Sequence, residues 1–151
     1  MRVDETVSLV ACRVGDIELG IELIRVQEIN RLVEATFVPR LDPEIRGLIN
    51  LRGSLVTVLD LGTILRGESV EVGRGTRNII VELRGERYGL LVDEVGDVIE
   101  ATAKPIESLP SHVESCEARW FAGLVQREDG VVLALDIDAV LARRFEEPIE
   151  S

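Results

Sequence analysis

The segment from Gly47 to Leu65 reads GLINLRGSLVTVLDLGTIL, and the segment from Gly123 to Leu141 reads GLVQREDGVVLALDIDAVL. The two segments align without a gap at an offset of 76 residues, and six of their nineteen positions are identical. Upstream, Leu19 to Ile29 matches Tyr88 to Val98 in the same way at an offset of 69 residues. The sequence therefore predicts one β-rich module that occurs twice.

The two copies differ most clearly at one turn. The first copy has Asn50-Leu51-Arg52-Gly53 where the second has Gln126-Arg127-Glu128-Asp129. A feature that a shared fold does not require is a candidate for function, so this difference draws attention to the first copy.

Short apolar segments that alternate with polar residues and are separated by glycine-containing turns predict β-strands. Residues 7–21 and 79–92 each predict a hairpin. Residues 55–59 and 131–135 are nearly continuous apolar runs, which predicts strands buried on both faces. The expected fold class is therefore all-β.

Helix is expected only in short pieces. Asp60 and Asp136 each precede apolar residues with i, i+3, i+4 spacing, which predicts two helices that begin behind an N-cap residue. Residues 23–25 predict one further helical turn.

The chain is predicted to form a single domain over residues 1–151 with two lobes. The glycine-rich stretch 66–77 suggests a connector, which places lobe 1 at about 1–72 and lobe 2 at about 76–151. The longest expected loop is the segment Ala101 to Arg119.

Composition excludes several classes of protein. The 151 residues are 46% hydrophobic and 30% charged, which is typical of a folded globular protein. No apolar run approaches the roughly 18 residues of a membrane span. The amino terminus is acidic and unlike a signal peptide, so a cytoplasmic protein is expected. The net charge of −11 argues against binding to nucleic acid or to anionic membranes.

The residues that commonly carry catalysis are scarce. His112 is the single histidine, and Cys12 and Cys116 form neither a disulfide framework nor a metal-ligand pattern. The sequence has no nucleophile elbow and no phosphate-binding loop. We therefore expect a binding module rather than an enzyme, with no metal and no cofactor.

Glu28 and Arg52 are charged residues in otherwise apolar strand context. Two interpretations remain open. The residues could form a structural ion pair between two strands of one lobe, or a partner-contact pair at a lobe edge. Both interpretations predict that the two side chains lie within salt-bridge reach.

At these residues the chain resembles the CheW family, the adaptors of bacterial chemosensory arrays. The resemblance covers residues 7–142. It rests on the motifs Val26-Gln27-Glu28-Ile29, Val38-Pro39, Ile45 to Gly53 (IRGLINLRG), Val56 to Leu61 (VTVLDL), Gly89 to Val95 (GLLVDEV) and Phe121-Ala122-Gly123-Leu124.

The resemblance implies two SH3-like five-stranded β-barrels that share a hydrophobic seam. It implies a cytoplasmic, non-enzymatic scaffold that joins the hairpin tips of methyl-accepting chemoreceptors to the regulatory domain of the histidine kinase CheA. The receptor hairpin would dock between the lobes, and other CheW copies would be partners in rings. Association with the membrane would then occur only through receptor arrays.

The resemblance also implies partner-binding residues. The positions that match the family's partner-binding motif, with the two that flank them, are Val26, Glu28, Gly47, Leu51, Arg52 and Gly53. The chain departs from the family at Thr57, where proline is usual, which puts the geometry of this strand in doubt.

Two other functions remain open. The first is a divergent CheW-like adaptor of an alternative chemosensory system that binds receptor but little or no kinase. The second belongs to another class, a double barrel that binds a small molecule or has weak enzymatic activity.

Overall fold

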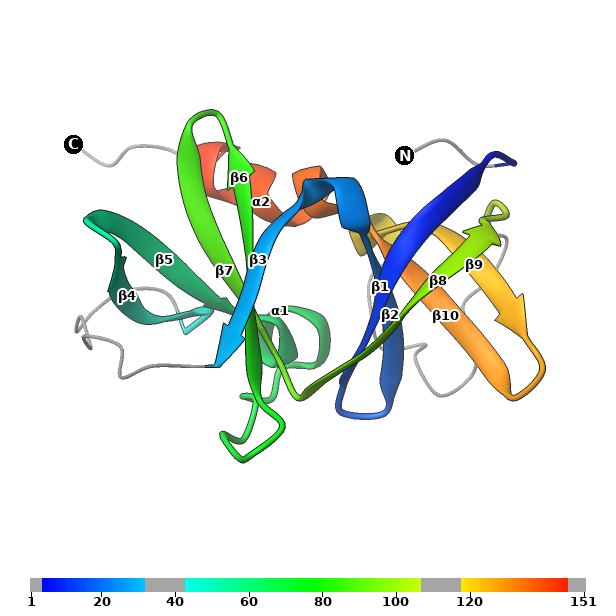
Figure 1. Cartoon of the computed structure of the whole chain (residues 1–151), viewed down its shortest axis with the longest axis horizontal. Coiled ribbons are helices and arrows are strands. Elements are labelled where there is room, and N and C mark those ends of the chain that lie inside the picture. The colour runs from blue at the N-terminus through cyan, green and yellow to red at the C-terminus, as the bar shows by residue number, and fades with distance from the viewer. Residues whose placement is uncertain (1–3, 32–42, 107–117, 147–151) are drawn as a thin grey trace.

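The computed structural model describes residues 4–31, 43–106 and 118–146 (Figure 1). Its strands are β1 (Thr6–Val14), β2 (Ile17–Glu22), β3 (Val26–Arg31), β4 (Ile45–Leu51), β5 (Ser54–Asp60), β6 (Arg77–Leu83), β7 (Glu86–Val92), β8 (Glu94–Thr102), β9 (Phe121–Arg127) and β10 (Gly130–Leu135). Its helices are α1 (Leu61–Arg66), α2 (Ile137–Glu146) and the 3₁₀ turns η1 (Leu23–Arg25) and η3 (Ala118–Trp120). The predicted hairpins, both N-capped helices and the helical turn at 23–25 are confirmed.

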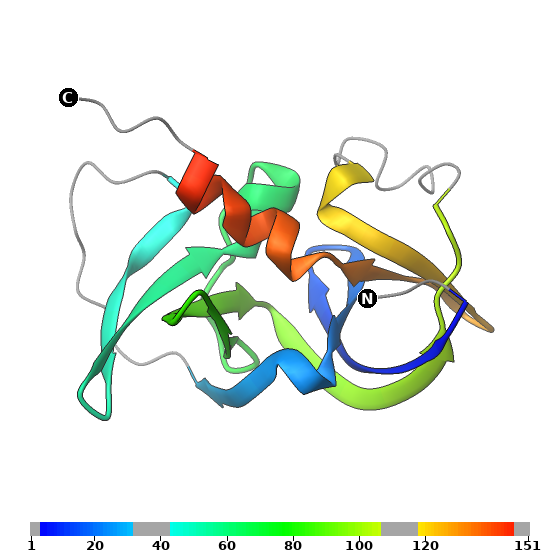
Figure 2. The same ribbon diagram turned by 90° about the horizontal axis from the view of Figure 1, so that it is seen from above.

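The strands form two curved five-stranded sheets, one in each lobe (Figures 1 and 2). Sheet A has the order β8-β1-β2-β10-β9, and sheet B has the order β3-β6-β7-β5-β4. The predicted fold class is confirmed, although the ladders of the described strands do not close completely. In sheet A, an isolated bridge between Lys104 and Leu124 joins the two edges at one point.

The internal duplication is visible strand by strand. Gly47–Leu65 and Gly123–Leu141 each form a strand, a turn, a second strand and the start of a helix. Even an irregularity repeats. The ladder β3–β6 shifts register between Val26 and Glu28, and the ladder β8–β1 shifts register next to the equivalent residue Val95.

The lobes do not follow the halves of the sequence, and the predicted lobes 1–72 and 76–151 are wrong at their boundary. Sheet B holds β3 to β7, which are residues 26–92, and sheet A holds β1, β2 and β8 to β10. Each third strand therefore pairs with the first strand of the other copy, because β3 joins β6 and β8 joins β1. The connector at 66–77 lies within one lobe.

We call this pairing of each third strand with the other copy the strand exchange. The length of the connections between strands explains it. In its own copy, β3 would have to lie beside β1 and parallel to β2, as β8 does in sheet A. A connection between parallel strands needs about a dozen residues or more. Only residues 23–25 separate β2 from β3, and only Asp93 separates β7 from β8. Each third strand must therefore cross to the other lobe.

Three apolar clusters fill the described part of the protein. The largest lies in the seam between the sheets and draws on both sheets and both helices, with Leu19, Ile21, Leu59, Leu90, Leu65 and Leu141 among its members. The others lie inside the lobes, with Ile49, Val56, Val58, Val70, Ile80 and Leu91 in sheet B and Leu9, Ala103, Val125, Val132 and Ala134 in sheet A. The predicted hydrophobic seam is thus the main core.

The interior of sheet B has one polar residue where sheet A has an apolar one. Asn78 is equivalent to Leu9, is fully buried, and makes no side-chain hydrogen bond to a described residue. Both residues lie against a glycine. A Cβ atom added at Gly89 would come within 2.3 Å of Asn78 Oδ1, and one added at Gly20 would come within 2.8 Å of Leu9 Cδ1. A side chain at either glycine would therefore require the facing Asn78 or Leu9 side chain to move.

The strand exchange predicts that a fragment of residues 1–72 does not fold. This fragment contains β3, β4 and β5 but lacks β6 and β7, which lie between them in sheet B. It also leaves β1 and β2 without the other three strands of sheet A. Far-ultraviolet circular dichroism should show no cooperative melting for the fragment, whereas the full chain melts cooperatively. A cooperatively melting monomeric fragment would contradict the exchange.

Candidate partner-binding site

The predicted site residues all lie in the lobe of sheet B. Val26 and Glu28 belong to the edge strand β3, Gly47 and Leu51 belong to the other edge strand β4, and Arg52 and Gly53 form the turn to β5. Gly47 is buried, has a φ of +151° and lies where the β4–β5 ladder shifts register. In the structure Gly47 therefore lies at an irregularity of the β4–β5 ladder, and its role in partner binding stays a prediction.

The Arg52-Gly53 turn holds an arginine in a backbone conformation that non-glycine residues seldom adopt. The φ angles are +51° at Arg52 and +87° at Gly53, and the flanking residues Leu51 and Ser54 pair directly. Positive φ at both central residues is the mark of a type I′ hairpin turn. Asn50 Oδ1 accepts a hydrogen bond of 2.9 Å from Gly53 N, which helps to fix the turn.

Arg52 donates a hydrogen bond to Glu28 Oε2, so the predicted pair is confirmed. Arg87 on β7 adds a second cation, with 3.3 Å between Arg87 Nη2 and Glu28 Oε2. Asn30 Nδ2 donates to the other carboxylate oxygen at 3.1 Å. We call Glu28, Arg52 and Arg87 the arginine cluster. It joins both edge strands of sheet B to β7 at one end of the lobe.

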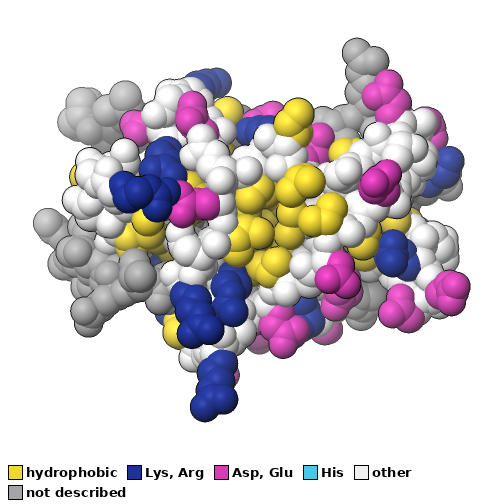
Figure 3. Space-filling model, in the orientation of Figure 1, with side chains coloured by type: hydrophobic (Ala, Val, Ile, Leu, Met, Phe, Trp, Pro, Cys, Tyr) yellow, Lys and Arg dark blue, Asp and Glu magenta, His cyan; other side chains and the backbone are white. Residues whose placement is uncertain are grey.

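The arginine cluster is accessible from solvent. The Arg52 side chain is 68% exposed, whereas those of Glu28 and Arg87 are 25% and 21% exposed. An ion pair with such an exposed partner contributes little to folding stability. Of the two interpretations of this pair, the exposure favours the partner contact. Figure 3 shows basic side chains on this lobe and apolar side chains gathered between the lobes.

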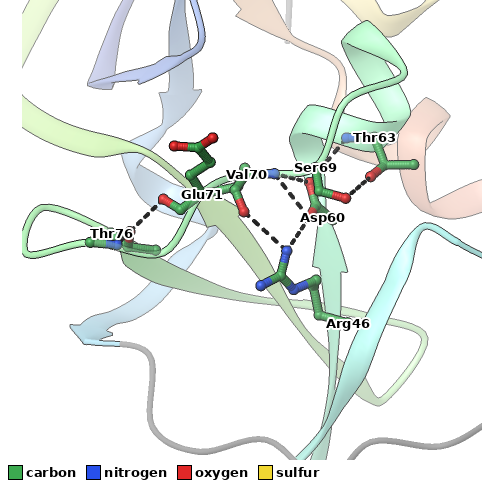
Figure 4. A network of polar contacts seen from close by, with 8 residues as sticks. Arg46, Asp60, Thr63, Ser69, Val70, Glu71 and Thr76 are labelled. Atoms are coloured by element: carbon green, nitrogen blue, oxygen red, sulfur yellow. Dashed lines mark hydrogen bonds and ion pairs between the residues drawn. The ribbon is translucent and has the colours of Figure 1, made fainter.

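A buried carboxylate lies at the other end of the same hairpin. Asp60 caps α1 by accepting a hydrogen bond of 3.0 Å from Thr63 N, as its place before the helix predicts. Its side chain also accepts from Val70 N at 3.1 Å and from Arg46 Nη1 at 2.9 Å (Figure 4). Asp60 thus ties β4, α1 and the connector together. No local sequence pattern indicated the contact with Arg46, because the two residues are 14 positions apart.

A second exposed surface lies between the lobes, and its residues were not predicted from the sequence. Ile29 and Val98 are equivalent residues of the edge strands β3 and β8, paired with Ile79 and Val10 respectively. Ile79 belongs to the seam cluster, so Ile29 is on the seam side of sheet B, yet it is 39% exposed. Val98 is 51% exposed.

The η1 turn adds Leu23 and Ile24 to this surface, with 42% and 88% exposure. We call Leu23, Ile24, Ile29 and Val98 the interlobe apolar face. Two adjacent apolar residues in a three-residue helical turn cannot both be directed inward. The pair Leu23-Ile24 could therefore have predicted an exposed apolar side chain from the sequence. Arg25 of the same turn bonds Asp138 of α2 at 2.9 Å, which holds η1 in place.

The described residues show no cluster of metal ligands, no reactive thiol and no helix that could span a membrane. They contain no group of three or more His, Cys, Asp and Glu that could hold a metal ion. Cys12 is buried, and burial together with the charge of Glu18 raises the pKa of its thiol to about 12, so the thiol stays protonated. Among the described helices, none is long and apolar enough to cross a membrane. His112, Cys116 and the motif Val38-Pro39 lie outside the described residues.

The arginine cluster makes a prediction about pH. The hydrogen bond from Arg52, followed by that from Asn30 and the charges of Arg52 and Arg87, lowers the pKa of Glu28 below its ordinary value of 4.5 despite partial burial. Because the pKa of Glu28 is lower in the folded than in the unfolded protein, its ionised carboxylate stabilises the fold at pH values above the ordinary carboxyl pKa. This contribution to stability is lost as the pH falls through the pKa of the folded protein. In Arg52→Ala, carbon-13 NMR titration should show the Glu28 midpoint moving up toward 4.5.

Arg84→Ala is a matched control for this titration. Arg84 and Gly85 form a turn with the same signs of φ as Arg52 and Gly53, between β6 and β7. This substitution should leave the Glu28 midpoint where it is in the native protein. An unchanged midpoint in Arg52→Ala would mean that the pair does not persist in solution.

Comparison with known proteins agrees with this architecture. The family described as CheW-like domain matches residues 8–145. The chain is 35% identical to the chemotaxis protein CheW of Bacillus subtilis (strain 168) over 124 residues, which are 82% of this chain and 80% of that protein. It is 28% identical to the chemotaxis protein CheW of Klebsiella aerogenes over 128 residues, which are 85% and 77% of the two chains.

A solved structure shares the fold. The crystal structure of the scaffolding protein TtCheW from Thermoanaerobacter tengcongensis superposes with a TM-score of 0.80 at 24% sequence identity. The alignment covers 91% of this chain and 88% of that one. On the family match and the sequence relatives, the chain belongs to the CheW-like domain family of chemotaxis scaffold proteins.

Proposed function

We propose that this protein is a non-enzymatic adaptor that couples the cytoplasmic tips of methyl-accepting chemoreceptors to the histidine kinase CheA. One observation carries the proposal. The protein has two separate exposed surfaces of different chemistry, the arginine cluster at one end of sheet B and the interlobe apolar face, on one frame with a continuous core. Two such surfaces suit a protein that holds two partners at once.

The arginine cluster is the proposed contact for the regulatory domain of CheA. Its guanidinium groups are held before binding, since Glu28 bonds both Arg52 and Arg87. Gln27 Oε1 accepts a further hydrogen bond of 3.0 Å from Arg87 Nε. Side chains that are already ordered lose little conformational freedom when a partner binds. Arginine also offers several donors in a fixed geometry for carboxylates and backbone carbonyls.

The interlobe apolar face is the proposed contact for the receptor tip. A receptor tip is a helical hairpin, and a helix commonly binds with its apolar face against an apolar surface of the partner. The four apolar residues come from η1 and from both edge strands that cross between the lobes. A helix seated there would contact both lobes and would sense their relative position.

The adaptor would act by geometry and effective concentration. When two partners bind one rigid body, the second contact becomes effectively intramolecular, and the combined affinity exceeds either single affinity. A change in receptor shape can alter kinase activity only if the contacts differ between the two receptor states. The continuous seam between the two surfaces keeps the frame stiff enough to transmit such a difference.

A first prediction concerns the kinase. Arg52→Ala and Glu28→Ala should each weaken binding of the CheA regulatory domain by about ten- to a hundredfold, as expected when a charged hydrogen bond is lost. Glu128→Ala is the matched control, since Glu128 occupies the equivalent turn position of the second copy. Isothermal titration calorimetry gives the affinities, and thermal melting of each variant reports any loss of fold. Unchanged affinity and unchanged melting in both variants would exclude the arginine cluster as the contact.

A second prediction concerns the receptor. Ile29→Glu and Val98→Glu should weaken binding to a receptor tip fragment by at least about tenfold, because each places a charge where apolar surface would be buried. Val72→Glu is the control, since Val72 is 55% exposed but lies in the connector between α1 and β6. Kinase affinity should be unchanged in all three variants.

These two measurements also separate the alternative function. A divergent adaptor of another chemosensory system would bind the receptor fragment through the interlobe apolar face and would bind CheA weakly or not at all. The native chain would then show receptor affinity that Val98→Glu reduces, with no measurable CheA affinity to lose.

A further inference from the structure

Each lobe has an end at which the residues equivalent to the arginine cluster lie, and we call this end the mouth of the lobe. The two mouths carry different charged residues. In sheet B the arginine cluster lies at the mouth. The repeat offsets place Asp97 of sheet A at the position of Glu28, Glu128 at the position of Arg52, and Glu18 at the position of Arg87. An acidic residue therefore occupies the position of Glu28 in both lobes, but in the lobe of sheet A glutamates stand where sheet B has two arginines.

Sheet A has a hollow of about 340 Å³ at this mouth. The lining combines apolar residues that include Ala11, Ile99 and Val132 with the charged residues Glu18, Asp97, Asp129 and Arg127. Ile99 and Val132 also belong to the apolar interior of this lobe, so the floor of the hollow is continuous with the core. We call this hollow the sheet A mouth.

The carboxylates of the sheet A mouth form no ion pair within the described part of the chain. No hydrogen bond or ion pair joins the side chains of Glu18, Asp97 or Asp129 to a described residue, whereas Glu28 contacts two arginines. Among the described residues that line the hollow, Arg127 is the one cation, against the three carboxylates of Glu18, Asp97 and Asp129. The mouth is therefore a hollow with an apolar floor and an excess of negative charge.

The charge of the whole lobe has the same sign. Residues 26–92, which span the strands of sheet B, contain nine Lys and Arg and nine Asp and Glu. In the lobe of sheet A, the described residues 4–25, 93–106 and 118–135 contain five Lys and Arg and eleven Asp and Glu, an excess of six negative charges. A field of this kind attracts a basic partner surface and speeds its approach.

We infer that the sheet A mouth binds an arginine side chain of a partner protein, in the way that the mouth of sheet B holds its own Arg52 and Arg87. The apolar floor suits the aliphatic part of the side chain. The carboxylates of Asp97 and Glu18 suit the planar guanidinium, which can bond two oxygens at once. This inference depends on the comparison of the two mouths and does not depend on the proposed contacts with CheA or the receptor.

The probe for this site is N-acetyl-arginine amide, titrated into the isotopically labelled full-length protein and followed by backbone amide NMR. We expect saturable shifts at Asp97, Ile99 and the turn Asp129-Gly130. The neutral analogue N-acetyl-glutamine amide should give no saturable shift there. Asp97→Asn and Glu18→Gln should each weaken probe binding by about tenfold, as expected for loss of a charged hydrogen bond.

Glu100→Gln is the matched control, because it removes the same charge from β8. Glu100 pairs with Ser8 and points to the opposite side of the strand from its neighbour Ile99. Probe affinity should be unchanged in this variant. Equal weakening by Glu100→Gln and Asp97→Asn would show a general charge effect and would overturn the inference.

A second variant supplies the arginine from within the chain. Glu128→Arg combined with Asp129→Gly copies the Arg52-Gly53 turn into the second copy. The new arginine should occupy the sheet A mouth, abolish the saturable shifts at Asp97, and raise the melting temperature. Undiminished probe binding in this folded variant would mean that the probe does not bind in the mouth.

Discussion

The exchange of the third strands is the constraint on which the rest of the structure depends. With three residues between β2 and β3 and one between β7 and β8, neither third strand can return to its own copy. Each completes the sheet of the other lobe, and the chain crosses the seam twice. The seam is consequently the largest apolar cluster rather than a loose contact between two domains. Both proposed binding surfaces are fixed by it.

The exchange also produces the surface between the lobes. The crossing segments run along the seam as edge strands, so part of their apolar side remains uncovered at Ile29 and Val98. An edge strand with exposed apolar residues is a liability for aggregation unless a partner covers it. In an adaptor this exposure has a use, because the residues belong to both lobes and are held by the same core.

A duplicated frame gives two equivalent positions for every side chain, and function can arise where the copies diverge. At the lobe mouths, Glu28 pairs with two arginines, whereas the residues equivalent to those arginines in the lobe of Asp97 are glutamates. In the interiors, Leu9 is replaced by Asn78, which is buried without a hydrogen bond to a described residue. An unpaired buried amide costs stability, so sheet B has a more polar interior below its arginine cluster. The same fold thus has one mouth in which the carboxylate is paired with arginines and one mouth with an excess of carboxylates.

The buried carboxylate of Asp60 links stability to the site. Because it is fully buried, its charge has to be balanced by Arg46 and by backbone donors, and it meets this requirement with residues from β4, α1 and the connector. These bonds fix the base of the hairpin whose tip carries Arg52. The equivalent Asp136 caps α2 by accepting a hydrogen bond of 3.0 Å from Ala139 N.

The sequence by itself determined the features whose information is local. Alternation of apolar residues defined the hairpins, an aspartate before an apolar helical pattern defined both helix starts, and the aligned copies defined the repeat. The pairing of Glu28 with Arg52 was also predictable, since each charge stands in an apolar strand. The buried faces were predicted less well, because Leu55 at the end of β5 is 66% exposed.

Only the tertiary structure decided which copy each third strand joins. The strands β3 and β8 are equivalent, and so are their partners β6 and β1, so the pattern of side chains fits either pairing. The choice depends on strand order and on the distance that a short connection can span. The local periodicity of apolar residues predicts neither of these. The lobe boundary, the exposure of Ile29 and Val98 and the sheet A mouth all follow from that choice, because each is made by strands that meet across the exchange.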